Sequence, residues 1–184
     1  MKNYDVIIVG AGAAGMMCAI KAGSRKRRVL ILEHSNKPGK KILMSGGGYC
    51  NFTNYYIAPE RYLSHNPHFC RSALSRYTQW DFIHLVESHD IRYHEKSQGE
   101  LFCDNKARVL VDMLLKECEQ VGVEIALNTS ITSIKKSETG FDLVTDKGQF
   151  KTQAVVVASG GLSIPTLGAS PFGYQLAEQF GIVI

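Results

Sequence analysis

Three glycines near the start of the chain have the spacing of a phosphate-binding turn. Gly10, Gly12 and Gly15 fit the pattern G-x-G-x-x-G. In this pattern the first glycine permits a tight turn, the second lets the backbone approach a pyrophosphate, and the third lets a helix pack closely on a strand. The backbone N–H groups at 10–15 are therefore candidate ligands for a phosphate at the start of a helix.

A carboxylate follows these glycines at the sequence spacing expected for an acid that binds the ribose of a dinucleotide. Glu33 lies 18 positions after Gly15. A carboxylate there can accept hydrogen bonds from both ribose hydroxyls of an adenosine, and it would repel a 2′-phosphate. The combination predicts a site for an adenine dinucleotide. The alternative is a plain βαβ unit whose glycines serve only turns.

The elements that position these residues follow from the surrounding hydrophobic pattern. Residues 6–9 and 29–32 are short aliphatic runs rich in β-branched side chains, as expected of buried strands in a parallel sheet. The apolar run between them predicts a helix that ends near Gly23. Strand, glycine turn, helix, strand and acid in this order predict an α/β, Rossmann-like domain.

A second glycine segment, residues 40–54, reads KKILMSGGGYCNFTN. Three consecutive glycines make a poor helix and a poor strand, but their N–H groups make a good cradle for a ligand. Ser45 and Asn51 could donate hydrogen bonds to the pyrophosphate, the ribityl chain or the ring of a cofactor. A flexible surface loop explains the same composition. Cys50 is either a reactive thiol or a small buried one.

A third glycine turn, at residues 159–161, follows the valine-rich run 154–158. Open α/β sheets place their ligands at the C-terminal ends of such strands. Residues 131–134, 141–145 and 149–152 are separated by polar and glycine turns, which predicts an antiparallel three-stranded meander at about 130–152.

The remaining pattern predicts helices over 66–77, 78–91, 106–120 and 174–179, and a strand over 123–127. Thr78 and Asp81 have the spacing of a capping box. Within the second of these helices Trp80, Phe82, Leu85 and Val86 are expected in the core.

Composition narrows the possible functions. A chain of 184 residues can form one domain, or one domain with a small excursion. The net charge of +4 is mild, and the basic run at 25–28 follows a helix whose dipole it complements. Basic and aromatic residues are not interleaved. Nucleic acid is therefore not an expected partner. No apolar run reaches the roughly 18 residues that cross a membrane.

Side chains for other chemistries are missing from the pattern. The five cysteines are odd in number and include no C-x-x-C, which disfavours disulfides, a zinc ribbon or a flavin-linked disulfide reductase and suits the cytoplasm. The six histidines lack metal-ligand spacing, so no metal site is predicted. No residue stands out as a general acid or base, and the catalytic residues stay unknown.

The motifs GAGAAG at 10–15, Glu33 and KILMSGGGYCNFTN at 41–54 together resemble the BaiN/YhiN-like family of NAD(P)/FAD-dependent oxidoreductases, also labelled the aminoacetone oxidase family. The resemblance covers all 184 residues. The turn at 159–161 resembles the A-T-G-G motif of flavoproteins, and a final family motif is matched at Ser163, Pro165, Gly168, Gly173 and Tyr174. Tyr49 and Glu100 stand where the family has arginine, and Cys103 stands where it has proline.

The resemblance implies FAD as the cofactor. NAD(P)H would reduce it, and electrons would pass to a small organic substrate, such as a carbon–carbon double bond, or to oxygen. From their spacing and from the resemblance, the residues expected to contact the cofactor are Gly10, Ala11, Gly12, Ala13, Ala14, Gly15, Glu33, His34, Lys41, Ser45, Gly46, Gly47, Gly48, Cys50, Asn51, Val123, Ser159, Gly160 and Gly161.

Family members continue well beyond residue 184, so the resemblance covers only an N-terminal half. A substrate domain and a C-terminal segment that completes the FAD site are expected elsewhere, and the missing half could be a partner chain. One alternative is an inactive remnant that binds FAD or ADP. Another is an NAD-dependent Rossmann dehydrogenase, which does not account for the second glycine segment.

Overall fold

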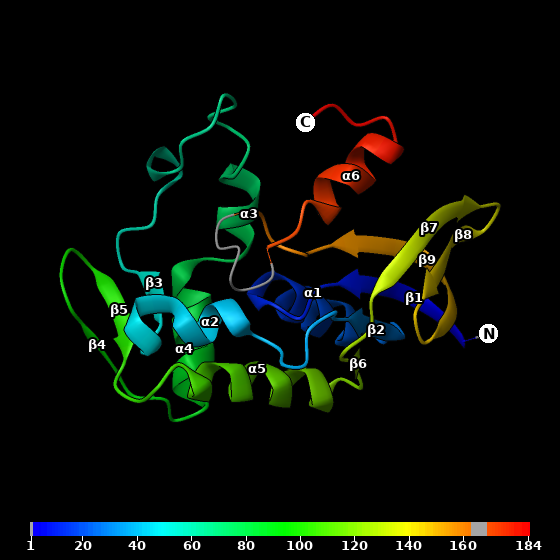
Figure 1. Ribbon diagram of the computed structural model, residues 1–184. Helices are drawn as coiled ribbons and strands as arrows, with labels where there is room; N and C mark the ends of the chain where they lie inside the picture. The colour runs from blue at the N-terminus through cyan, green and yellow to red at the C-terminus, as the bar shows by residue number, and fades with distance from the viewer. Residues whose placement is uncertain (1, 163–168) are drawn as a thin grey trace. The chain divides into compact units, whose positions relative to one another are not determined.

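The computed structural model describes residues 2–162 and 169–184 (Figure 1). The motif residues Ser163, Pro165 and Gly168 lie outside the described residues. The chain forms two compact units, the first made of Met1–Lys41 with Leu114–Ile184 and the second of Ile42–Met113. The boundaries fall within α2 (Lys40–Met44) and α5 (Arg108–Gln120). None of the helices in the described part of the chain is long and apolar enough to cross a membrane.

The first unit is built on a six-stranded sheet with the order β6-β2-β1-β9-β8-β7. Its parallel part contains β6 (Glu124–Ala126), β2 (Val29–Leu32), β1 (Lys2–Val9) and β9 (Gly148–Val157). Its antiparallel part adds β8 (Gly140–Thr145) and β7 (Ile131–Ser137) beside β9. The α/β fold with a parallel sheet and a three-stranded antiparallel meander is therefore confirmed.

One strand differs from the prediction. Residues 149–152 and 154–158 were expected as separate strands, but β9 runs from Gly148 to Val157 without a break. Residues 148–152 pair with β8 on one edge, and residues 150–157 pair with β1 on the other. No glycine or proline interrupts this stretch, so one strand can serve both the meander and the parallel sheet.

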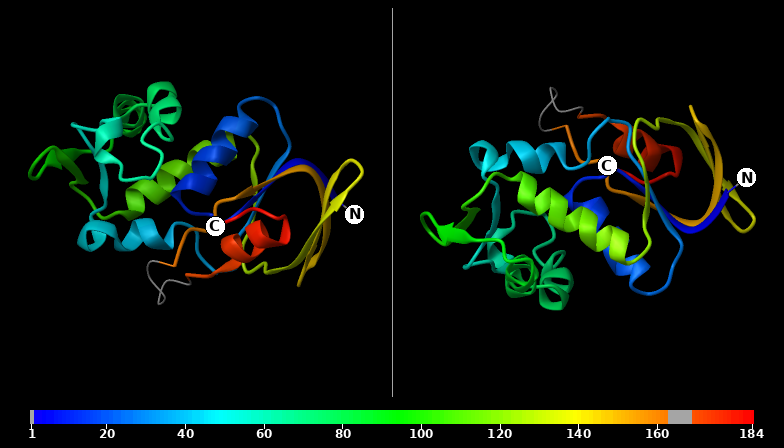
Figure 2. Two further views of the ribbon diagram at one scale, coloured as in Figure 1. Left: turned by 90° about the horizontal axis from the view of Figure 1, so that it is seen from above. Right: turned by 90° about the horizontal axis from the view of Figure 1, so that it is seen from below.

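Both faces of this sheet are covered at β1. Ile7 and Ile8 point to opposite faces, and neither is exposed. On one face Ile7 and Leu30 pack with Leu176 of α6 (Phe172–Gln179). The helix α1 (Ala13–Gly23) packs on β1 and β2, and Figure 2 shows it on the side of β1 opposite α6. The predicted buried strand is confirmed.

The second unit contains a three-stranded antiparallel sheet with the order β3-β5-β4. Its strands are β3 (Asn51–Asn54), β5 (Glu100–Cys103) and β4 (Tyr93–Glu95), and its helical elements are η1 (Ser45–Gly48), η2 (Pro59–Arg61), α3 (Arg71–Arg76) and α4 (Gln79–Ser88). The sequence did not predict this sheet, because strands of three or four residues are too short to display a period of two.

The start of one predicted helix in this unit and the burial of one residue in another need correction. The helix expected over 66–77 begins only at Arg71, because the side chain of Asn66 accepts a hydrogen bond from the His68 N–H (3.0 Å) and competes with helical pairing. The capping box of α4 is confirmed: the Thr78 N–H donates to Asp81 Oδ2 at 2.7 Å. Trp80, however, is 50% exposed and does not belong to the core.

Candidate functional site

The glycine turn after β1 combines tight packing with one open position. Gly10 has φ +106°, and a Cβ on it would lie 2.5 Å from the carbonyl oxygen of Ala158. A Cβ on Gly15 would overlap the carbonyl oxygen of Gly10, whereas a Cβ on Gly12 would meet no atom within 4 Å. Packing of the chain thus explains Gly10 and Gly15. The open space at Gly12 fits a pyrophosphate that approaches the start of α1.

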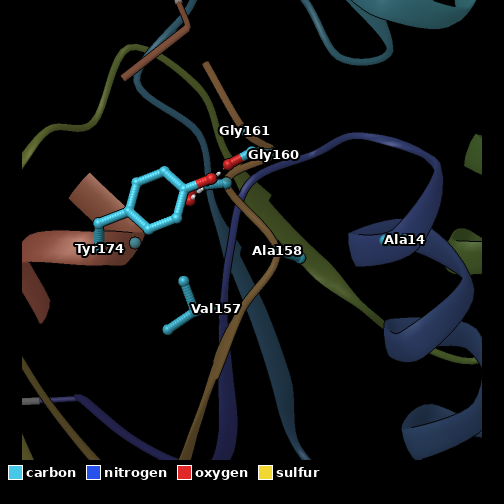
Figure 3. A pocket seen from close by; sticks show the side chains of 8 residues that line it. Ala14, Val157, Ala158, Gly160, Gly161 and Tyr174 are labelled. Carbon is cyan, nitrogen blue, oxygen red and sulfur yellow. Dashed lines mark hydrogen bonds between the residues drawn. The ribbon is translucent and has the colours of Figure 1, made fainter. Parts of the chain in front are cut away.

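The turn after β9 lies beside the turn after β1. The Ala158 N–H donates to the Val9 oxygen at 2.9 Å, and Val9 pairs with Val157 in the parallel register. An open cavity of about 470 Å³ adjoins this edge of the sheet (Figure 3), lined by Ala14, Val157, Ala158, Ser159, Gly160, Gly161, Gly173 and Tyr174. The structure therefore brings residues 10–15 and 159–161 together at the strand ends where ligands are expected.

Two further side chains reach the second turn. Figure 3 shows the Tyr174 ring pointing from α6 toward Gly160 and Gly161, and a Cβ on Gly161 would lie 3.7 Å from the Tyr174 oxygen. Lys41, a predicted cofactor residue, has its Nζ 3.7 Å from the position of a Cβ on Gly160. Tyr174 was not among the predicted contacts. The sequence pattern that could have indicated it is the glycine directly before the tyrosine, Gly173–Tyr174, at the start of a predicted helix.

Glu33 ties the end of β2 to the first glycine turn. Its Oε2 accepts from the Ala11 N–H at 2.8 Å, and its Oε1 accepts from the Ser35 N–H at 2.9 Å and the Ser35 hydroxyl at 2.6 Å. Burial raises the pKa of Glu33, but the hydrogen bonds from Ser35 and Ala11 outweigh burial and lower this pKa below its ordinary value. A carboxylate has about four acceptor positions, so these bonds leave room for a ribose hydroxyl.

The neighbours of Glu33 come from its own loop and from β6. The exposed His34 lies with Nδ1 3.2 Å from Glu33 Oε1. The Glu33 N–H donates to Ala126 and the Glu33 carbonyl accepts from the Thr129 N–H, both at 2.9 Å. The backbone that follows β6 is therefore adjacent to the acid.

Val123 lies away from this group. It precedes β6, and since Ala126 pairs with Leu32 in parallel, Val123 lies at the opposite, N-terminal end of the strand. Its N–H donates to the Cys118 oxygen at 3.0 Å, just after α5. Val123 is therefore at the end of β6 away from Glu33, and its contact with the cofactor stays a prediction. The rule that ligands bind at the C-terminal ends of parallel strands would have selected residues after 126.

The glycine segment at 45–51 belongs to the second unit. Gly46, Gly47 and Gly48 all have positive φ (55°, 66° and 89°), so the left-handed backbone requires glycine there. Ser45 Oγ donates to the Ile42 oxygen at 2.8 Å, and Asn51 Nδ2 donates to Glu100 Oε1 at 3.2 Å. These two predicted cofactor donors are thus engaged within their own unit.

The cysteines of this unit are buried thiols. Burial raises the pKa of Cys50, and the hydrogen bond with Ser45 offsets only part of this effect. Burial, with Cys50 and Asp104 nearby, raises the pKa of Cys103 to about 12. Neither thiol is activated as a nucleophile at neutral pH. Over residues 2–162 and 169–184, no three His, Cys, Asp or Glu side chains are grouped as metal ligands would be.

Comparison with known proteins identifies relatives of this chain. Ribosomal RNA dihydrouridine synthase of Escherichia coli (strain K12) is 57% identical over 182 residues, which are 99% of this chain and 46% of that protein. The 3-dehydro-bile acid delta(4,6)-reductase of Clostridium scindens is 30% identical over 178 residues, 95% of this chain and 43% of that protein. The chain spans about half the length of the curated relatives it matches.

A solved structure shares the fold. Glycine oxidase from Geobacillus kaustophilus matches with a TM-score of 0.60 and 17% sequence identity, over 100% of this chain and 60% of that one. Residues 4–184 match the HI0933-like protein Rossmann domain, which replaces the narrower family suggested by the motifs. The chain belongs to the HI0933-like family, within the superfamily of FAD-dependent oxidoreductases.

Proposed function

We propose that this chain is the FAD-binding part of a reductase that converts uridine in ribosomal RNA to dihydrouridine. The reaction adds two hydrogens across the C5–C6 double bond of uracil: uridine, NAD(P)H and a proton give dihydrouridine and NAD(P)⁺. The observation that carries the proposal is 57% identity with the E. coli ribosomal RNA dihydrouridine synthase along 99% of this chain. An RNA partner departs from the expectation that nucleic acid is not bound.

The residues of the first unit have defined tasks under this proposal. The N–H groups at 10–15 bind the pyrophosphate. Glu33 accepts a hydrogen bond from a ribose hydroxyl, and its hydrogen bond from the Ala11 N–H holds the turn in place. The turn at 159–161 and Tyr174 line the cavity. This cavity would hold the flavin side of the cofactor, which follows the pyrophosphate. FAD supplies the hydride-transfer chemistry when bound, and the chain supplies position and exclusion of water. An enzyme of ribosomal RNA works in the cytoplasm, which suits the unpaired cysteines.

The test starts from the purified chain. Bound flavin is identified by its absorbance and by chromatography after denaturation, and the chain is then given NAD(P)H and ribosomal RNA that lacks dihydrouridine. We expect FAD to bind and the RNA nucleosides to gain the mass of two hydrogens. A chain that binds FAD but never reduces uridine, alone or with the remaining half of a relative, would support the inactive remnant instead. A chain that takes up no FAD would refute the proposal.

A further inference from the structure

The second unit carries an exposed segment in which aromatic and basic side chains alternate. It is the connection from β3 to the start of α4, residues 55–80 (Figure 1). We call it the aromatic–basic segment. Its aromatic residues are Tyr55, Tyr56, Tyr62, Phe69, Tyr77 and Trp80, and its basic residues are Arg61, Arg71 and Arg76, with His65 and His68. Its acidic counterpart is Glu60 alone.

The rings of this segment are on the surface. Phe69 is 80% exposed, Trp80 50% and Tyr62 47%. Trp80 already stacks on Tyr55, with ring centroids 5.5 Å apart and planes at 27°. Large apolar side chains that stay exposed along one segment are candidates for contact with a partner. This segment corrects the expectation that basic and aromatic residues are not interleaved in the chain. The interleaving was missed because Trp80 was expected in the core, and the sequence does not record which rings are exposed.

The charges of this segment favour a partner that carries negative charge. Arg71 Nη2 lies 3.8 Å from Glu60 Oε1, but both side chains are more than half exposed, so this ion pair is weak. Guanidinium groups between exposed rings are what a single-stranded nucleic acid requires, since bases stack on rings and phosphates meet the cations. Arginine and aromatic residues are also enriched in protein–protein contacts, so the choice of RNA over a protein partner rests on the proposed function.

We propose that the aromatic–basic segment binds single-stranded RNA, with bases on Phe69, Tyr62 and Trp80 and phosphates on Arg61, Arg71 and Arg76. The choice of RNA rests on the proposed function, whereas the rings and charges are observations of the second unit. A reductase of uracil must reach a base outside a duplex. A segment that holds unpaired nucleotides would present such a base.

The experiment measures binding of a fluorescein-labelled, single-stranded RNA of mixed sequence to the full chain by anisotropy, at low and moderate salt. The ring variant is Tyr62→Ala with Phe69→Ala, and the charge variant is Arg61→Ala with Arg76→Ala. The matched control is Arg25→Ala with Arg27→Ala, which removes the same charge from exposed positions of the first unit. Thermal unfolding and FAD affinity are measured on every variant to show that each one is folded.

We expect the ring variant to bind RNA more weakly by roughly five- to a hundredfold for each lost base stack. The charge variant should bind more weakly and lower the salt dependence by about one to two units of slope. The control should stay within about twofold of the unchanged chain.

Three results would overturn the inference: equal loss in the control, no loss in the ring variant, or a ring variant that changes self-association while RNA binding is retained. The last result would make the segment a protein-contact surface. FAD binding and dihydrouridine formation are scored separately, so a chain that binds FAD but not RNA refutes this inference without deciding the proposed function.

Discussion

At the scale of single residues, the three glycines of the first turn differ in what they touch. A Cβ on Gly12 would meet no atom within 4 Å, so only the loss of a favourable N-cap residue of α1 opposes Gly12→Ala. We predict that this substitution lowers the free energy of unfolding by at most about 1 kcal/mol. The same methyl group would occupy space needed by the pyrophosphate, so FAD affinity should fall about tenfold or more, roughly 1.4 kcal/mol. Urea unfolding without ligand and FAD titration measure the two effects.

Gly15→Ala is the matched control for this prediction. Its methyl group would overlap the carbonyl oxygen of Gly10, so it should destabilise the chain by about 1–3 kcal/mol even without FAD. If Gly12→Ala bound FAD as tightly as the original chain, the open space at Gly12 would not belong to the cofactor site.

A second residue-scale prediction concerns Glu33. Its pKa is lowered in the folded chain, so its stabilisation is complete above the unfolded-state value of about 4.3 and disappears as pH falls through the lower folded value. We predict that Glu33→Gln lowers the free energy of unfolding by about 1–3 kcal/mol at pH 7, because two N–H groups and a hydroxyl lose a charged acceptor. Urea unfolding at pH 7 and at decreasing pH tests this.

The difference between Glu33→Gln and the original chain should therefore shrink as pH drops below 4. Glu138→Gln, in the exposed turn between β7 and β8, is the control and should change stability little at any pH. A loss in Glu33→Gln that is independent of pH would assign the effect to shape rather than to charge.

Sequence spacing located Gly10, Gly12, Gly15 and Glu33 because each has a fixed relation to one strand end. It could not show that Val123 lies at the end of β6 away from these residues, since the polarity of a strand relative to the site depends on which neighbour it pairs with. Tyr174 matches the family motif but was not predicted as a contact. Its approach to Gly161 depends on how α6 packs on the sheet, which the motif alone does not show.

At the scale of elements, α6 is the helix that carries Tyr174 to the cavity. Leu176 anchors it, at 8% exposure, in the cluster with Ile7 and Leu30. We predict that Leu176→Ala destabilises the chain by about 2–4 kcal/mol, because it removes buried methyl groups and leaves a cavity. Urea unfolding provides the measurement.

Ile182→Ala is the comparison, since Ile182 is 60% exposed just after the same helix. Its effect should stay within about 0.5 kcal/mol. Similar losses for both variants would mean that the α6 end of the chain does not depend on Leu176 for its packing.

Elements with strong local signals were predicted and those without were not. The capping residues Thr78 and Asp81 announced the start of α4 correctly. The strands β3, β4 and β5 gave no signal, because each is three or four residues long and gains its stability from pairing with the others. The long β9 was divided in the prediction because its two halves differ in composition, although hydrogen bonding makes them one strand.

At the scale of the whole molecule, the sequence predicted one domain, or one domain with a small excursion, and gave no borders for a second unit. The borders of residues 42–113 fall within the helices α2 and α5, so neither border coincides with a loop between elements. The α/β class was predictable, since one βαβ unit with a glycine turn already implies a parallel sheet.

The identity of the ligand that stabilises the folded chain distinguishes an FAD-binding protein from an NAD-dependent dehydrogenase. A ligand that binds only the folded chain stabilises it by about 2.7 kcal/mol at 100 times its Kd. For a chain of this size we predict that FAD raises Tm by roughly 5–10 °C at that concentration. ADP at the same molar concentration should raise Tm less, because it makes only the contacts expected of Gly12 and Glu33 with the adenosine diphosphate part and therefore has a higher Kd. Gly12→Ala should reduce both shifts together, because both ligands share that part. A rise with NAD and none with FAD would instead identify a nicotinamide-dependent dehydrogenase, and the cavity beside Gly160 and Tyr174 would then need another occupant.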